Sequence, residues 1–414
     1  EAATPEWLTK SYMEKALQAY YKDPQLLITK CDFSMALGKG ENFGGILTKA
    51  IVDYESRAEN QQNSYIVKTS FEGDEFATEK LRPYDIFNRE ISIYENVLPK
   101  LNDLMQEIHI EDELFAKAVC VDYKRAAIIF EDLSLRGFVM ADRTQGLDAE
   151  HAHLILRKLA IMHATSAVLN ERERGCLETY DRGFFNRHTN VYSSFFVGNL
   201  DACSQLVSQW SDFKYYGKKL HDLKPYYMEI GKRCFKPTPG HVNVLAHGDL
   251  WTNNAMFKYD EVSGRPLDVL LIDFQFAFWG SPTLDMHHFF NTSLKENMRL
   301  YQQDELFKYY HGIFTDALRK LHYHTNPIPT LHQFQMHAEQ KRFFAFHSSC
   351  IIQPVMINKD TDDADFNALM GEDERAVRFK RNIYKNKIVQ RNLRQLLPMF
   401  DKRGLLDTNQ NDSI

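Results

Sequence analysis

The sequence has no apolar run that approaches the roughly 20 residues needed for a membrane-spanning helix. Its formal net charge is −6, so no excess of positive charge would attract nucleic acid or an acidic membrane surface. The 6 cysteines are scattered, and neither a CxxC pair nor a zinc-ligand spacing occurs. We therefore expect a cytoplasmic protein with free thiols, without a membrane span or a nucleic-acid partner.

Signatures of several enzyme classes are also missing. The chain contains neither the G-x-S-x-G elbow of serine hydrolases nor the HExxH motif of zinc proteases. A hydrolase that activates water with His247 and Asp249 would need one of these features, which argues against that function. The first residues (1–21) are polar and amphipathic, unlike a signal peptide, and the lack of an initial Met leaves room for a preceding segment.

The chain is long and apolar enough to bury a large core. It has 414 residues, of which 44% are hydrophobic, and we expect two lobes or domains. No internal repeat or low-complexity linker marks a boundary between them.

The most informative stretch runs from Leu245 to Gln275. It contains two carboxylates, Asp249 and Asp273, and the amide of Asn254 stands five positions after the first. An apolar run at 269–272 predicts a buried strand that delivers Asp273 at its end. Phosphoryl transfer uses such a set, because one carboxylate accepts the proton of the attacking hydroxyl while a carboxylate and an amide hold Mg²⁺.

The order and spacing of these residues resemble the H-R-D-x-x-x-x-N and D-F-G motifs of protein kinases, with Gly248 in place of Arg and Gln275 in place of Gly. This variant is similar to the phosphotransferases of the aminoglycoside and choline kinase type, which act on small molecules. The fuller pattern resembles the ecdysteroid kinase-like (CHK kinase-like) family, on the strings HGDLWTNNAMF, DVLLIDFQ and GSPTLDMHHF.

The resemblance implies an α+β, two-lobed, protein-kinase-like fold. We expect an N-lobe at 1–131, with an antiparallel sheet and one helix, and a larger, mainly helical C-lobe at 132–414. ATP would lie between the lobes. The span from Asp273 to Asp285 is too short for a protein-kinase activation loop, which argues against a protein substrate.

The resemblance also implies ATP- and Mg²⁺-dependent transfer of the γ-phosphate to a hydroxyl of a small molecule. The acceptor would be an ecdysteroid or a similar hydroxylated lipophile, in a detoxifying role, and no obligate protein partner is evident. Two alternatives stay open, a choline- or ethanolamine-type kinase and a catalytically inactive relative that binds nucleotide or ligand. An inactive relative would be marked by loss of an active-site residue, and none is lost.

A glycine-rich turn at 38–45 separates predicted strands at 28–37 and 46–54. Backbone amides of such a turn can close over phosphates, although a plain hairpin turn would look the same. It is not a Walker A loop, since no GK[ST] follows. Under the resemblance, Gly38, Gly40 and Asn42 cover the phosphates. The chain departs from the family at Gly45, where a Ser or Thr is common, which weakens only the side-chain contact.

A third strand at 64–69 carries Lys68, and an amphipathic helix is predicted at 85–101 with Glu90 on its inward side. An inward carboxylate needs a cationic partner, and Lys68 is the natural candidate. A solvated lysine at the strand end is the alternative. The pair matches the lysine–glutamate ion pair of kinases, in which Lys68 would contact the α/β-phosphates and Glu90 would orient it.

Two further strands, at 116–123 and 125–130, run into Glu131-Asp132-Leu133. In kinase-like folds this is the hinge whose backbone binds the adenine edge, and we assign Glu131 and Leu133 to nucleotide binding on that resemblance. For the side chains, a helix cap by Asp132 is an equal alternative.

In the remaining chain, a helix is predicted at 148–169, and the aromatic stretch at 182–240 is expected to form part of the acceptor pocket. Asp285 is expected to cap a helix and brace the catalytic loop. The adjacent His287 and His288 cannot share a helix face as metal ligands. The basic run at 375–394 has helical spacing and predicts a solvated outer face.

Overall fold

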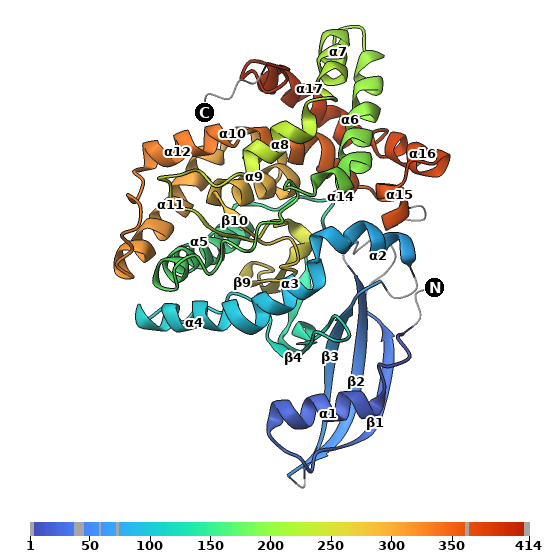
Figure 1. The fold of residues 1–414 in the computed structure, drawn as a ribbon, viewed down its shortest axis with the longest axis vertical. Coiled ribbons are helices and arrows are strands. Elements are labelled where there is room, and N and C mark those ends of the chain that lie inside the picture. Colours follow the sequence, from blue (N-terminus) through green and yellow to red (C-terminus); the bar gives the residue numbers. More distant parts are fainter. Residues whose placement is uncertain (1–3, 37–44, 58, 72–73, 361–363, 410–414) are drawn as a thin grey trace.

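The computed structural model describes residues 4–36, 45–57, 59–71, 74–360 and 364–409. It confirms the expected α+β class, because a strand-rich N-terminal part is joined to a larger, mainly helical part (Figure 1). The predicted boundary between lobes coincides with the end of a strand at Glu131. The division into two lobes stays a prediction.

The N-terminal part is built on a five-stranded antiparallel sheet, in the order β1-β2-β3-β5-β4. Its strands are β1 (Leu27–Met35), β2 (Ile46–Ser56), β3 (Glu59–Thr69), β4 (Ala118–Asp122) and β5 (Ala127–Glu131). Strand β3 is central, and Lys68 near its end is paired with Leu47 on one side and Ile128 on the other. Lys68 is therefore the penultimate residue of the central strand.

Helix α1 (Lys10–Tyr21) covers one face of the sheet (Figure 1). The hydroxyl of Thr9 caps it by accepting a hydrogen bond from Tyr12 N at 3.3 Å, which satisfies one of the free amides of the first turn. Its buried Met13 and Leu17 belong to a small apolar cluster with the sheet residues. The apolar spacing at 7–21 predicts a helix there, and the observed helix begins three residues later, at Lys10.

The helix predicted at 85–101 is interrupted. It consists of α3 (Ile86–Ser92), a π-helical turn (Ile93–Val97) and α4 (Leu98–Glu107). Pro99 stands at the start of α4, and because proline has no amide hydrogen, the normal hydrogen bond of that turn cannot form. A further helix, α2 (Glu75–Leu81), was not predicted. The buried side chains of α4 share one apolar core with the helical part.

The larger part contains most of the helices. They are α5 (Ala149–Arg172), α6 (Ser193–Ser208), α7 (Lys214–Leu223), α8 (Tyr227–Phe235), α9 (Pro282–Ser293), α10 (Glu296–Tyr301), α11 (Gln303–Lys320), α12 (Leu331–Gln340), α13 (Phe343–His347), α14 (Gln353–Met356), α15 (Phe366–Met370), α16 (Glu374–Ile383) and α17 (Lys387–Asp401). A second π-helical segment, Ser348–Ile352, joins α13 to α14.

Short strands in the larger part carry the informative stretch of the sequence. Strands β6 (Phe138–Met140), β8 (Ala255–Tyr259) and β9 (Pro266–Leu271) form one sheet, and β7 (Val244–Ala246) pairs with β10 (Phe278–Gly280). Strand β7 ends immediately before His247, β8 begins immediately after Asn254, and β9 ends two residues before Asp273. The strand predicted before Asp273 is therefore present, and rigid elements flank every candidate residue of this stretch.

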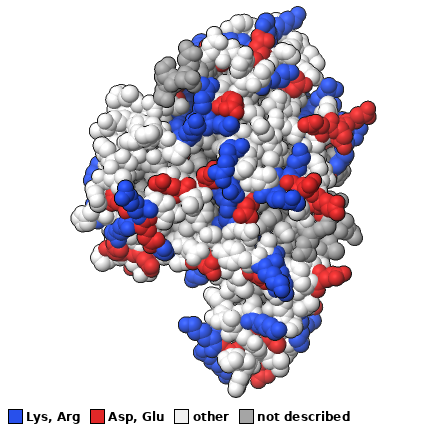
Figure 2. Space-filling model, in the orientation of Figure 1, with Lys and Arg blue, Asp and Glu red and all other residues white. Residues whose placement is uncertain are grey.

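Acidic and basic side chains are interspersed on the face seen in Figure 2. In the basic run at 375–394, Arg375, Arg391 and Arg394 pair with acidic neighbours, as in the contact between Arg391 and Glu296 at 2.8 Å. Lys380 departs from the predicted solvated face, because it is only 4% exposed and donates a hydrogen bond to Gly371 O at 2.7 Å. Within the described residues, we find no helix with the length and apolar character required to traverse a bilayer.

His287 on α9 makes the stability of the fold sensitive to acid. Its ring is fully buried, and Nε2 donates to Ala338 O at 2.7 Å. Burial, with a smaller effect of Arg342, lowers the pKa of His287 to about 3. An unfolded histidine has a pKa of about 6.5, so the unfolded chain binds the extra proton between these values and stability falls as pH drops through that window.

We predict that His287→Leu has a lower melting temperature than the wild type at about pH 7.5. At about pH 5 the difference between the two melting temperatures should be smaller, because only the wild type is destabilised by acid at this position. Thermal unfolding at both pH values checks this. His332→Leu, at an exposed position on α12, should show no such narrowing. A gap for His287→Leu that is constant with pH would contradict the assignment.

Candidate active site

Residues 247–254, here called the HGD loop, connect β7 to β8. The carboxylate of Asp285 holds the start of this loop, because it accepts hydrogen bonds from His247 N at 2.6 Å and Gly248 N at 2.9 Å. His163 on α5 contacts the same carboxylate at 2.9 Å. Burial raises the pKa of Asp285, but the bond from His163 and the neighbouring groups outweigh it and hold the pKa below its usual value.

Asp285 therefore braces the loop as predicted, but it is not the helix cap. Ser281 caps α9, with its hydroxyl accepting from Thr283 N at 3.3 Å, and Pro282 occupies the first turn.

Gly248 lies where no other residue fits without displacement. Its φ of +85° is in the left-handed region that side chains disfavour. A Cβ at this position would stand 2.0 Å from the carbonyl oxygen of Phe276. Position 248 therefore requires glycine, because a side chain would collide with Phe276.

His247 joins the HGD loop to the strand that leads to Asp273. Its Nε2 contacts Ile272 O at 2.9 Å, and its Nδ1 accepts a long hydrogen bond of 3.4 Å from Asp249 N. Burial lowers the pKa of His247, which favours the neutral ring that this pair of bonds requires. Both ring nitrogens are thus used to hold the backbone.

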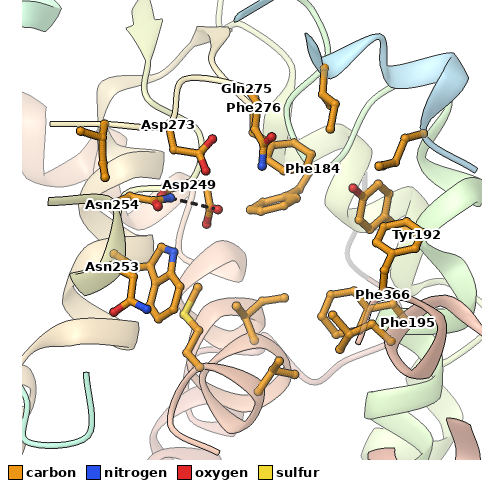
Figure 3. Close-up of a pocket in the computed structure, with 18 of the residues that line it drawn as sticks. Phe184, Tyr192, Phe195, Asp249, Asn253, Asn254, Asp273, Gln275, Phe276 and Phe366 are labelled. Carbon is orange, nitrogen blue, oxygen red and sulfur yellow. Dashed lines mark hydrogen bonds between the residues drawn. The ribbon is translucent and has the colours of Figure 1, made fainter. Parts of the chain in front are cut away.

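The amide of Asn254 orients Asp249 (Figure 3). Its Nδ2 donates to the Asp249 carbonyl at 2.7 Å and to Oδ2 of the side chain at 3.3 Å. Since the nitrogen is used in this way, the amide oxygen is left as the group that could bind a cation. Burial raises the pKa of Asp249, while the hydrogen bond from His288 acts in the opposite direction.

Asp273 has a strained backbone. Its φ is +67°, which is uncommon for a residue other than glycine, although aspartate is among those that tolerate it. Such strain concentrates at functional sites, where surrounding contacts hold it in place. Here the Asp273 carboxylate contacts Lys68 Nζ at 3.0 Å, and the next amide, Phe274 N, donates to Glu90 at 3.1 Å.

The predicted Lys68–Glu90 pair is present, at 2.7 Å, with side-chain exposures of 5% and 1%. Burial by itself lowers the pKa of Lys68, but Asp273 and Glu90 outweigh it and the pKa is raised. Burial also raises the pKa of Glu90, against the opposing effect of Lys68. Two carboxylates thus share one ammonium group. A divalent cation beside Asp273 and Asn254 would compensate the excess negative charge, so the donor set fits Mg²⁺.

A cavity of about 250 Å³ lies beside this cluster. Lys68, Glu90, Glu131, Leu133 and Asp273 all line it. The predicted nucleotide-binding residues of the strand, the helix and the hinge are therefore brought together. Gly38, Gly40 and Asn42 lie outside the described residues.

The hinge side chains are engaged with the protein itself. The carboxylate of Glu131 accepts from Lys117 N at 2.9 Å. Asp132 accepts from Ser134 N at 3.0 Å and contacts Lys49 at 2.8 Å. Although burial opposes it, the bonds from Lys49 and Ser134 lower the pKa of Asp132 to about 2. Asp132 therefore acts as the cap, and the backbone amide of Glu131 donates to Lys117 O at 3.1 Å.

A second cavity, of about 150 Å³, is also lined by Asp273 (Figure 3). Its wall is mostly aliphatic and aromatic, and includes Phe184, Tyr192, Phe195, Phe276, Ile352, Val355, Met356, Phe366, Leu369 and Met370. Asp249, Asn254 and Gln275 line the same cavity. The two cavities share Asp273 and three apolar residues, so they meet at that carboxylate.

Two contributions to this site were not predicted. Six of the described residues in its apolar wall, Ile352, Val355, Met356, Phe366, Leu369 and Met370, come from a region that the sequence indicated only as helical. His288 contacts Oδ1 of Asp249 at 3.0 Å, across 39 positions of the chain. The sequence shows His287 and His288 as neighbours, which excludes a shared metal site on one helix face. No local pattern indicates a contact with a residue 39 positions away.

The sequence matches the ecdysteroid kinase-like family over residues 39–323, which is most of the chain. No curated protein shows significant similarity to it. Two solved structures share 12% identity with it. An ethanolamine kinase of Plasmodium vivax covers 87% of this chain and 84% of its own, with a TM-score of 0.39. A microcompartment-associated aminopropanol kinase covers 96% and 99%, with a TM-score of 0.42.

We predict that Gly248→Ala lowers the melting temperature far more than Gly240→Ala does. Both glycines have φ near +80°, so both variants carry the left-handed penalty of about 1–2 kcal/mol. Only Gly248 adds the clash with Phe276, whereas a Cβ at Gly240 meets nothing within 4 Å. Thermal unfolding of the two variants checks this, and equal losses would contradict the close packing of the HGD loop.

Proposed function

Since the chain belongs to the ecdysteroid kinase-like family of small-molecule kinases, we propose that it moves the γ-phosphate of ATP, with Mg²⁺, to a hydroxyl of a hydroxylated lipophile such as an ecdysteroid. The observation that carries this proposal is the position of Asp273. It lies where a cavity lined by Lys68 meets an apolar cavity lined by Asp249. Donor and acceptor would thus approach each other between the two carboxylates.

Asp249 is the base or hydroxyl-positioning group. Its side chain is mostly buried, at 15% exposure, and it lines the apolar cavity that would hold the acceptor. A hydroxyl bound there would donate its hydrogen to the carboxylate, which orients the oxygen for attack and takes up the proton.

Asp273 and Asn254 are the metal-binding groups. When bound, Mg²⁺ bridges phosphate oxygens and neutralises the charge that develops on them. The Asp273 carboxylate and the free amide oxygen of Asn254 supply oxygen ligands of the kind that Mg²⁺ prefers. Lys68 would contact the α/β-phosphates, with Glu90 fixing its direction through the 2.7 Å pair.

The nucleotide would occupy the cavity of about 250 Å³. Its adenine edge would meet the backbone at Glu131 and Leu133, whose neighbouring side chains are tied to the protein. Gly38, Gly40 and Asn42 would close over the phosphates from the glycine-rich turn.

The wall of the second cavity favours a neutral lipophile over an amino alcohol. Among the described residues that line it, Asp249, Asp273 and Arg143 are the charged ones. Both carboxylates have roles in the chemistry, and Arg143 would repel an ammonium group. Aromatic side chains could stack on a cation as well as on a steroid, so the excess of aliphatic residues and the arginine decide the preference.

Asp249→Asn should retain binding of Mg·ATP but lose at least about 10²-fold in turnover, because the amide cannot accept the proton. Mass spectrometry would detect phosphate addition to a panel of ecdysteroids, other sterols, choline, ethanolamine and aminoglycosides. Product with wild type alone would establish both reaction and acceptor. Near-normal turnover of the variant would remove Asp249 from the mechanism, and failure of wild type to bind Mg·ATP would refute the kinase function.

Phe366→Ala should raise KM for the lipophilic acceptor by about tenfold and leave KM for ATP within about twofold. Phe366 lines only the apolar cavity, so truncation removes contact area from the acceptor site alone. Steady-state kinetics with each substrate varied in turn would measure this. An equal rise in both KM values would show that the two cavities are not separate sites.

A further inference from the structure

One face of α9 holds the HGD loop along its length. Asp285 binds the amides of residues 247 and 248, as described above. His288, three positions later and therefore on the same face, contacts the side chain of Asp249 at 3.0 Å. At the end of the helix, Ser293 Oγ accepts a hydrogen bond from Thr252 N at 3.0 Å. Of these contacts, the one from His288 reaches the reacting group itself.

The ring of His288 is fully buried and both of its nitrogens are engaged. Nε2 contacts Asp249 Oδ1 at 3.0 Å, and Nδ1 contacts Ser348 Oγ at 3.0 Å. The ring also stacks on Phe344, with centroids 5.5 Å apart and an angle of 14° between the planes. These contacts leave the imidazole one orientation.

We propose that His288 is a positioning residue, which donates its Nε2 hydrogen to Oδ1 of Asp249 and so leaves Oδ2 directed at the acceptor hydroxyl. An ionised carboxylate only accepts hydrogen bonds, so Nε2 must carry the hydrogen. In the neutral ring Nδ1 is then an acceptor, and the hydroxyl of Ser348 is the donor that selects this tautomer. The inference rests on the proposed role of Asp249 as base.

The two oxygens of Asp249 are held unequally. Oδ1 receives the 3.0 Å contact from His288, whereas Oδ2 receives only the longer 3.3 Å bond from Asn254. Without His288, Oδ1 would lose that donor in a largely apolar surrounding, and the carboxylate could turn towards other partners. A shift of about 1 Å in a reacting group can cost roughly 10²-fold in rate.

Ser348 links this arrangement to the acceptor cavity. It begins the π-helical segment 348–352, whose last residue, Ile352, lines the apolar cavity. Insertions of this kind in helices are often found at functional sites. Ser348, which contacts His288, therefore belongs to the same short segment as a residue of the apolar wall.

The test compares His288→Leu, His288→Gln and the control His287→Leu. Glutamine carries an Nε2 hydrogen the same number of bonds from Cβ as histidine does, so it can replace the donor. His287 is the adjacent buried histidine on the same helix, bound to Ala338 O instead of Asp249. The assay is phosphate transfer from Mg·ATP to an ecdysteroid, with melting temperatures measured for all variants.

We expect His288→Leu to lower kcat by roughly 10²-fold with KM for ATP nearly unchanged, and His288→Gln to recover most of that loss. His287→Leu should lose stability and keep kcat. Equal kcat losses at both histidines, or no better activity with glutamine than with leucine, would overturn the positioning role.

A second measurement does not depend on the acceptor. Imidazole nitrogen NMR of isotope-labelled histidine should show His288 with its hydrogen on Nε2, identified by the signal missing from His288→Gln. A ring without hydrogen on Nε2 would overturn the inference. If wild type phosphorylates nothing while this signal is present, the proposed function fails and the hydrogen bond to Asp249 stands.

Discussion

The structure depends on one buried cluster of charges, Lys68 with Glu90 and Asp273. Each comes from a different element, the central strand β3, helix α3 and the end of β9. A charge removed from water is tolerated only with a partner, so loss of any one group would leave the others uncompensated. The cluster therefore joins the sheet to the helical part at the point where the two cavities meet. The same three side chains thus connect the two parts of the fold and line the cavity of about 250 Å³.

A second set of contacts holds the HGD loop in place. Asp285 accepts hydrogen bonds from two backbone amides of the HGD loop, and Gly248 packs against the backbone of Phe276. The ring of His247 contacts the carbonyl oxygen of Ile272. Backbone amides bound to a buried carboxylate cannot move without losing strong hydrogen bonds. Asp249 is thus presented by a rigid support, and α9 supplies most of it.

The apolar cavity is built mostly from other parts of the chain than the cavity beside Lys68. Its apolar wall is assembled from the aromatic region around Phe184–Phe195 and from the segment at 352–370, which are far apart along the chain. Among the described residues that line it, the charged ones are Asp249, Asp273 and Arg143. Under the proposed function, shape and apolar contact would select the acceptor, while Asp273, which both cavities share, would mark where phosphate transfer takes place.

Local patterns in the sequence were enough to predict the candidate site residues and the main elements. Asp249, Asn254 and Asp273 were recognised because their spacing is local, and the Lys68–Glu90 pair because an inward carboxylate on an amphipathic helix requires a cation. The strands and helices were also predictable from local pattern, because side-chain direction repeats along each kind of element with a fixed period. The hydrophobic pattern of the sequence did not predict α2, the π-helical turn before Pro99 or the burial of Lys380.

Which distant residues meet became visible in the folded chain alone. The contact of His288 with Asp249, the clash that makes Gly248 obligatory and the composition of the acceptor wall all join segments that no local period relates. Such contacts depend on how whole elements pack, and the packing depends on every buried side chain at once. A motif can therefore name the reacting groups, whereas their supports and the acceptor they admit are properties of the folded chain.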